Sequence, residues 1–269
     1  MMQSTIRTSQ AWQWWRGMAQ VMAVALLLAG STQAQVNTES MRREWGGEGV
    51  HGQAGANLAL QQGNSPYLRL GLGARIDYLA NPFYTFLVAN WQRRTDAGTL
   101  KQHDGFLHGR VVYTVTPTVK AEGFAQKEFN DFIKLKDRTL LGAGARLTLA
   151  ETNTDSFMLV IHCGIGAMHE RELLNLEPTD ERQRLIRSTN YLTFAWRVRK
   201  TFSVTTTTYY QPAFGTPRDF RLLSNLTGTF SITDLLSFNV ALNYRYDHQP
   251  PPAVKPYDLT ISNGVTVGF

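Results

Sequence analysis

The chain has 269 residues, with 27 Lys and Arg against 21 Asp and Glu, and a formal net charge of +6. This bias is weak and the basic residues are scattered, which argues against a nucleic-acid-binding protein. The single cysteine, Cys163, excludes a disulfide framework and a cysteine-based metal site within the chain.

Residues 1–34 have the pattern of a secretory signal peptide. A basic start, an apolar stretch and a group of small residues follow in order, at Arg7 and Arg16, residues 18–29 (MAQVMAVALLLA) and residues 31–34 (STQA). A transmembrane anchor is the alternative, but the apolar run is shorter than the ~20 residues that a spanning helix needs. No cysteine follows the signal and no arginine pair precedes its apolar run. We therefore expect Sec-type export and a polar periplasmic lead-in at 35–48.

From residue 49 onward the chain divides into strand-like segments with almost no helical periodicity. Most are about as long as transmembrane strands, which need ~9–11 residues, and longer than the ~5–6 residues of soluble strands. The predicted strands are 49–61, 67–79, 83–94, 104–115, 118–128, 138–150, 156–170, 187–198, 201–211, 219–231, 235–247 and 257–269.

Apolar and polar side chains alternate along these segments, as expected for strands with one face in an apolar environment. In 67–79, Leu72 and Ile76 share one face, while Arg75 and Asp77 share the other. Aromatic residues fall near predicted strand ends, as in the interfacial girdles of membrane barrels. The alternative, the core of a soluble β-sandwich, would place them in the middle of strands.

The last predicted strand, 257–269 (YDLTISNGVTVGF), has one apolar face and one small or polar face, and it ends on an aromatic residue. In water, such a face and an unpaired edge invite aggregation, whereas a closed barrel in lipid removes both problems. The spacing also resembles the sorting signal read by the bacterial outer-membrane assembly machinery, which we expect as a partner during insertion. The matching residues are Ser262, Gly264, Val267 and Phe269.

The predicted connections alternate between short and long. The longer and more polar ones are 95–103, 129–137, 171–186, 212–218 and 248–256. Bacterial barrels have short periplasmic turns, longer outer loops and an even strand count. The pattern predicts a closed antiparallel up-and-down transmembrane β-barrel of about 12 strands over 49–269, in the outer membrane of a Gram-negative bacterium.

If the apolar face meets lipid, the other face lines the interior. The lumen-lining candidates are Arg69, Arg75, Asp77, His108, Arg110, Lys120, Glu122, Arg146, His162, Arg221, Arg245 and Asp247. Two interpretations stay open: the charges pair and fill a narrow barrel, or they line a water-filled path with a weak preference for anions.

Enzymatic chemistry has little support in the sequence. An outer-membrane phospholipase would need a serine within hydrogen-bond reach of a histidine, but His162 and Ser156 are far apart along their strand. We predict no catalytic residues, no metal and no cofactor. The charged connection at 171–186 leaves a receptor or adhesin open as an alternative, or contact with lipopolysaccharide.

Several stretches, in order along the mature chain, resemble the DUF481 family of bacterial outer-membrane proteins, whose members include a salt-induced outer-membrane protein. These stretches are 52–79, 138–147 (RTLLGAGARL), 207–212 (TTYYQP), 219–224 (DFRLLS), 244–252 (YRYDHQPPP) and the terminal strand. The resemblance implies an outer-membrane β-barrel and no known catalytic residue. Together with the residue patterns, it favours a non-enzymatic role, either as a narrow passive channel or as an envelope-integrity protein under osmotic or salt stress.

Overall fold

The structure is a computed structural model, and the residues that it describes are 38–39, 41–42, 47–176, 178–199, 201–233 and 235–267. The predicted signal peptide and Phe269 lie outside these residues. Apart from one 3-10 turn, η1 (Asp131–Ile133), every regular element of the described part is a strand, so the all-β prediction is confirmed.

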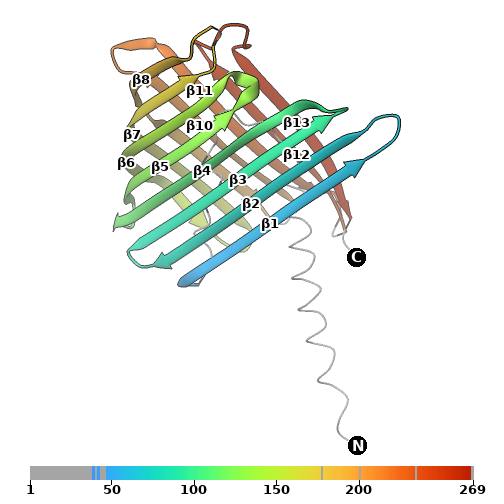
Figure 1. Ribbon diagram of the computed structural model, residues 1–269. Coiled ribbons are helices and arrows are strands. Elements are labelled where there is room, and N and C mark those ends of the chain that lie inside the picture. Colours follow the sequence, from blue (N-terminus) through green and yellow to red (C-terminus); the bar gives the residue numbers. More distant parts are fainter. Residues whose placement is uncertain are drawn as a thin grey trace, which may run out of the picture. The chain divides into compact units, whose positions relative to one another are not determined.

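All thirteen strands belong to one antiparallel sheet, in which each strand pairs with the next strand of the chain except at one break (Figure 1). One continuous sheet is not the pair of stacked sheets that a β-sandwich requires. The strands are β1 (Gly49–Gln61), β2 (Tyr67–Ala80), β3 (Phe83–Asp96), β4 (Thr99–Thr116), β5 (Val119–Asn130), β6 (Leu135–Asn153), β7 (Phe157–Leu174), β8 (Glu181–Ser188), β9 (Asn190–Val198), β10 (Phe202–Ala213), β11 (Thr216–Ser231), β12 (Leu236–Asp247) and β13 (Tyr257–Val267).

β8 and β9 together occupy one place in the sheet, because both lie between β7 and β10. The break between them is Thr189, whose backbone N–H still donates to the carbonyl oxygen of Gly166 at 2.8 Å. On the β10 side of this break, Pro212 has no backbone N–H to donate to a neighbouring strand. The thirteen strands thus correspond to the twelve that the sequence predicts, with the predicted strand at 187–198 split and extended toward the amino terminus.

The predicted contrast between short and long connections is largely wrong. Four of the segments expected as long outer connections instead continue as paired strands, so the connections there shorten to 97–98, 131–134, 175–180 and 214–215. Polar residues there keep the period of two and pair across the sheet, as Arg138 does with Glu172. The 171–186 connection is therefore mostly a hairpin of β7 and β8, and 248–256 is the one that stays long.

The two faces of the sheet differ sharply. The convex face exposes large apolar side chains such as Leu141 (64% exposed) and Ile165 (63%), whereas the concave face buries charged ones such as Arg146 and Arg110. The alternation predicted from sequence is confirmed, for example in β2, where Ile76 is exposed beside the buried pair of Arg75 and Asp77. This arrangement is the inverse of a water-soluble core, where charged groups stay in water.

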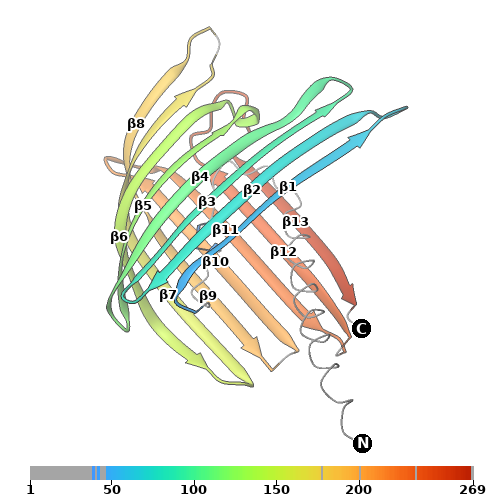
Figure 2. The same ribbon diagram turned by 60° about the horizontal axis from the view of Figure 1, so that its bottom comes forward.

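Strong curvature brings distant strands together across the concave face (Figure 2). The Tyr191 hydroxyl of β9 donates to Glu122 of β5, for example, although β6 and β7 separate these strands in the sheet. The order of pairing begins at β1 and ends at β13, and among the described residues no ladder joins these two strands.

Within the described part of the chain, no helix has the length and apolar character needed to cross a bilayer.

Candidate functional site

Two connected groups of charged residues lie on the concave face, besides the separate pair of Arg75 and Asp77. We name the first the N-terminal cluster: Thr38, Glu39, Arg42, Arg110 and Glu122. We name the second the arginine network: Arg138, Arg187 and Arg221 with Glu128, Glu170, Glu172, Asp219 and Asp247.

Strand geometry places the members of the arginine network together. Residues two apart on a strand share a face, so Glu170 and Glu172 of β7 both point to the concave side. Antiparallel register then sets opposite charges side by side, since Arg138 of β6 lies directly opposite Glu172 of β7. Arg221 of β11 likewise lies opposite Asp247 of β12. Such direct cross-strand pairs stabilise a sheet.

Arg221 is the centre of the network. Its guanidinium donates to Glu170 at 2.5 Å, to Glu172 at 2.8 Å and to Asp247 at 2.8 Å. Because β8 and β10 lie between β7 and β11 in the sheet, the contacts with Glu170 and Glu172 join strands that do not pair with each other.

The other two arginines extend this network along the concave face. Arg187 of β8 donates to Glu170 at 3.0 Å and to Asp219 at 3.0 Å. Arg138 donates to Glu128 at 2.7 Å and also to Glu172. Buried charges are tolerated only when they are paired and hydrogen-bonded, and each of these guanidinium groups has at least two carboxylate partners.

The N-terminal cluster joins Thr38, Glu39 and Arg42 of the predicted lead-in to the strands. The Arg110 guanidinium of β4 donates to Thr38 Oγ1 at 2.5 Å, to Glu39 and to Glu122 of β5. Arg42 also pairs with both carboxylates. Burial raises the pKa of Glu39, but the charges of Arg42 and Arg110 outweigh burial and lower this pKa to about 2.

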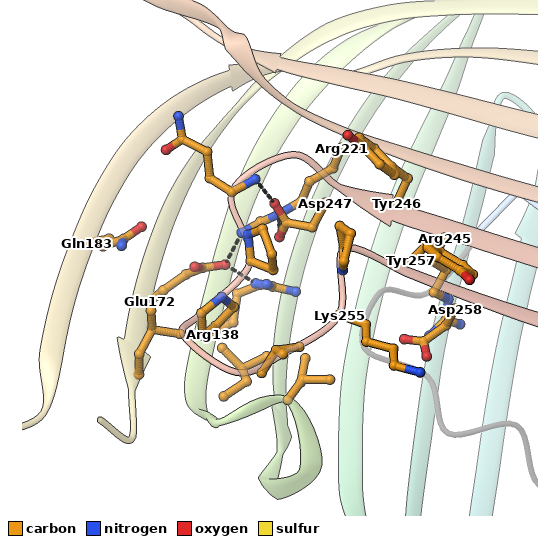
Figure 3. A pocket seen from close by; sticks show the side chains of 18 residues that line it. Arg138, Glu172, Gln183, Arg221, Arg245, Tyr246, Asp247, Lys255, Tyr257 and Asp258 are labelled. Atoms are coloured by element: carbon orange, nitrogen blue, oxygen red, sulfur yellow. Dashed lines mark hydrogen bonds and ion pairs between the residues drawn. The ribbon is translucent and has the colours of Figure 1, made fainter. Parts of the chain in front are cut away.

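Two small cavities lie on the concave side. The larger, of about 60 Å³, lies beneath the 248–256 connection, with Arg138, Glu172 and Arg221 on one side and Arg245 and Lys255 on the other (Figure 3). The second, of about 30 Å³, lies between the two charged groups. Each volume holds at most a few water molecules. Side chains therefore fill most of the concave space at these levels. At the opposite end of the sheet, a hollow of about 540 Å³ is lined by Asn153, Thr154, Asp155, Arg197 and Arg199.

Most of the lumen-lining candidates lie on the concave face, with different burial. Those that are buried are Arg75, Asp77, His108, Arg110, Glu122, Arg146, His162 and Arg221. Lys120, Arg245 and Asp247 are half-buried, whereas Arg69 is exposed. Arg69 lies on β2 beside the edge strand β1, so no further strand covers that flank.

Sequence reasoning missed much of the arginine network. Arg138, Glu170 and Arg187 fell at the very ends of predicted strands, and Glu172 fell in a predicted connection. The signal that could have found them is charge complementarity, because β5, β6 and β7 carry Glu128, Arg138 and Glu172 at the same level of the sheet.

The residues considered for catalysis do not assemble. Ser156 lies in the turn before β7, while His162 is buried within β7. His103 bonds to Asp131 at 2.7 Å on the exposed face, far from these two in the chain. Cys163 is a half-buried free thiol on the apolar face. Among the described residues, no group of three or more His, Cys, Asp or Glu side chains is arranged to hold a metal ion.

Fold and site together define an all-β protein made of one curved antiparallel sheet, with a charged concave face and an apolar convex face. Residues 53–269 match the family described as protein of unknown function, DUF481, so the chain belongs to this family. The match includes every strand from β2 to β13 and most of β1. No curated protein matches the chain.

Proposed function

We propose that this protein is a non-enzymatic β-barrel of the Gram-negative outer membrane that supports envelope integrity without opening a wide pore. In this proposal the barrel-assembly machinery inserts the exported chain, and β1 pairs with β13 to close the sheet. The observation that carries the proposal is the inverted distribution of side chains. A convex face of leucine and isoleucine around a concave face of ion pairs is stable in lipid but would be poorly soluble in water.

Closure of the sheet follows from the same reasoning. Backbone groups at an open edge have no partner in hydrocarbon, and each unsatisfied group costs several kcal/mol there. The sequence patterns of the two edge strands are compatible with pairing. On the concave face, β1 carries Gln53 and Asn57, and β13 carries Thr260 and Ser262. Pairing of β1 with β13 would therefore continue the polar interior.

The occupied interior supports an integrity role more than free diffusion of solutes. The arginine network links β7 with β11, Thr38 and Glu39 bond to Arg110 of β4, and the cavities at the level of these contacts measure about 60 and 30 Å³, whereas the hollow of about 540 Å³ lies at the other end of the sheet. A response to osmotic or salt conditions is the form of this role that the resemblance to a salt-induced protein favours.

A narrow passive channel is the second candidate. It is favoured by the charged residues that extend along the concave face from Arg146 to Arg221.

Closure is tested by disulfide cross-linking in a Cys163→Ala background. Single cysteines at positions 54, 56 or 58 of β1 are combined with cysteines at 259, 261 or 263 of β13, in protein folded in lipid vesicles. We expect one set of combinations, related by a constant register, to cross-link within the monomer. Absence of cross-links in all nine combinations, in protein that has otherwise folded, would contradict closure.

The role is tested by conductance in planar bilayers, with phospholipid hydrolysis measured on the same preparation. We expect no stepwise openings from the intact mature chain. Openings that change ion preference on Arg146→Glu would favour the channel instead, and lipid hydrolysis would favour the enzymatic alternative. Loss of a surface-binding phenotype on shortening the β7–β8 hairpin alone would favour a receptor or adhesin.

A further inference from the structure

The convex side of the β7–β8 hairpin carries arginines that face each other. Arg171 of β7 and Arg184 of β8 are direct cross-strand partners, and Arg182 follows on the same face, opposite Leu173. All three arginines are exposed. Like charges placed directly opposite each other destabilise a sheet. An anion bound between Arg171 and Arg184 would relieve this repulsion.

The described carboxylates near this hairpin are engaged elsewhere. Glu170 and Glu172 point to the concave side and belong to the arginine network. Asp180 pairs with Lys136 at 2.8 Å, and Glu181 accepts a hydrogen bond from a glutamine side chain at 2.9 Å. Within the described part of the chain, no carboxylate pairs with the three arginines.

The arginines lie directly beyond the apolar surface of the convex face. Ile186, two residues after Arg184 on the same face, is 56% exposed, and Ile165 and Leu141 continue the apolar surface over β7 and β6. Long cationic side chains at such a boundary extend toward the polar layer and leave their methylene groups against hydrocarbon. A ligand of these arginines would therefore have anionic groups at the boundary and acyl chains along the apolar surface.

The geometry points to a binding site for the phosphate groups of lipid A, the lipid anchor of lipopolysaccharide, formed by Arg171, Arg182 and Arg184. This inference rests on the proposed function, which places the β7–β8 hairpin on the outer side of the membrane. Guanidinium groups bind phosphate oxygens through paired hydrogen bonds. Three arginines on two strands match a headgroup that carries two phosphates better than they match a phospholipid with one.

The test is lipid retention measured by native mass spectrometry. The full mature chain, folded in detergent, is titrated with diphosphoryl lipid A, monophosphoryl lipid A and phosphatidylglycerol in separate experiments. The variant is Arg171→Gln with Arg184→Gln. The matched control is Arg218→Gln, an exposed arginine of β11 on the same face as Phe220.

We expect the double variant to weaken retention of diphosphoryl lipid A by about thirtyfold, since each basic residue at a membrane surface contributes roughly fivefold. Arg218→Gln should retain the lipid as the unchanged protein does. The unchanged protein should prefer diphosphoryl lipid A over both other lipids.

Equal retention by the double variant, equal loss in the control, or equal affinity for phosphatidylglycerol would each overturn the inference. Heat-modifiable migration in gels reports separately whether the protein forms a membrane barrel. A protein that folds in this way but retains no lipid A contradicts this inference alone, whereas a protein that never folds in lipid or detergent contradicts the proposed function.

Discussion

Replacing Arg221 with methionine tests whether the arginine network stabilises the folded protein. The guanidinium of Arg221 pairs with Glu170, Glu172 and Asp247, and the side chain is 5% exposed. Removing one partner of a buried ion pair costs ~3–5 kcal/mol, because the remaining charge stays buried. Glu170 and Glu172 each keep a second arginine, and Asp247 keeps a hydrogen bond from the backbone of Gln249. We therefore expect a loss near the lower end, about 3 kcal/mol.

The measurement is the free energy of unfolding in urea, for protein folded in lipid vesicles and followed by tryptophan fluorescence. Arg94→Met is the matched control, since Arg94 also pairs with a carboxylate, Asp96, at 2.7 Å, but the two side chains are 35% and 33% exposed. A partly exposed pair contributes less than ~1 kcal/mol. If both variants lose the same free energy of unfolding, or if Arg221→Met loses less than about 1 kcal/mol, the network does not stabilise the fold as described.

Three further predictions concern packing, pH and membrane contact. A Cβ atom at Gly164 would lie 1.9 Å from the Tyr191 ring. Gly164→Ala should therefore lower the free energy of unfolding by about 1–3 kcal/mol. The control is Gly123→Ala, which should leave this free energy unchanged because the space around Gly123 is open. Because the pKa of Glu39 is lowered to about 2, its stabilisation of the 38–42 segment is complete above pH 4.5 and is lost as the pH falls toward 2. In the unchanged protein, protection of this segment from proteases should follow that titration. In Glu39→Gln, protection should stay the same between pH 4.5 and 2. Cys163 should react with a charged thiol reagent in urea but not in vesicles, and rapid labelling in vesicles would contradict a lipid-facing position.

The period of two in the sequence was sufficient to predict most strands and both faces of the sheet. Leu141 and Arg146 lie on opposite faces as predicted, because one residue step in a strand reverses the side-chain direction. Strand ends were predicted less well. Residues such as Arg138 and Glu172 have the composition of a loop, and only their mutual pairing across β6 and β7 keeps them in strands.

Contacts between distant parts of the chain were also not predictable from periodicity. Glu39 is a polar residue in a segment without a repeating pattern, and its partner Arg110 is 71 positions away in sequence. Glu39 lies outside the sheet, against its concave face, and neither that placement nor the curvature of the sheet leaves a local pattern in the residues. For the same reason, sequence reasoning identified Arg221 as an interior residue but did not identify Glu170 as its partner.

Accessibility measured along β13 tests the central claim most directly. Spin labels are introduced one at a time from position 257 to 267, in a Cys163→Ala background, and collisions with oxygen and with a water-soluble nickel complex are measured in vesicles. Oxygen collisions should peak at positions such as 259, 261 and 265, and nickel collisions at positions such as 260, 262 and 266. A profile without this two-residue period, or equal nickel access on both faces, would contradict a sheet with one face in hydrocarbon and the other in a polar interior.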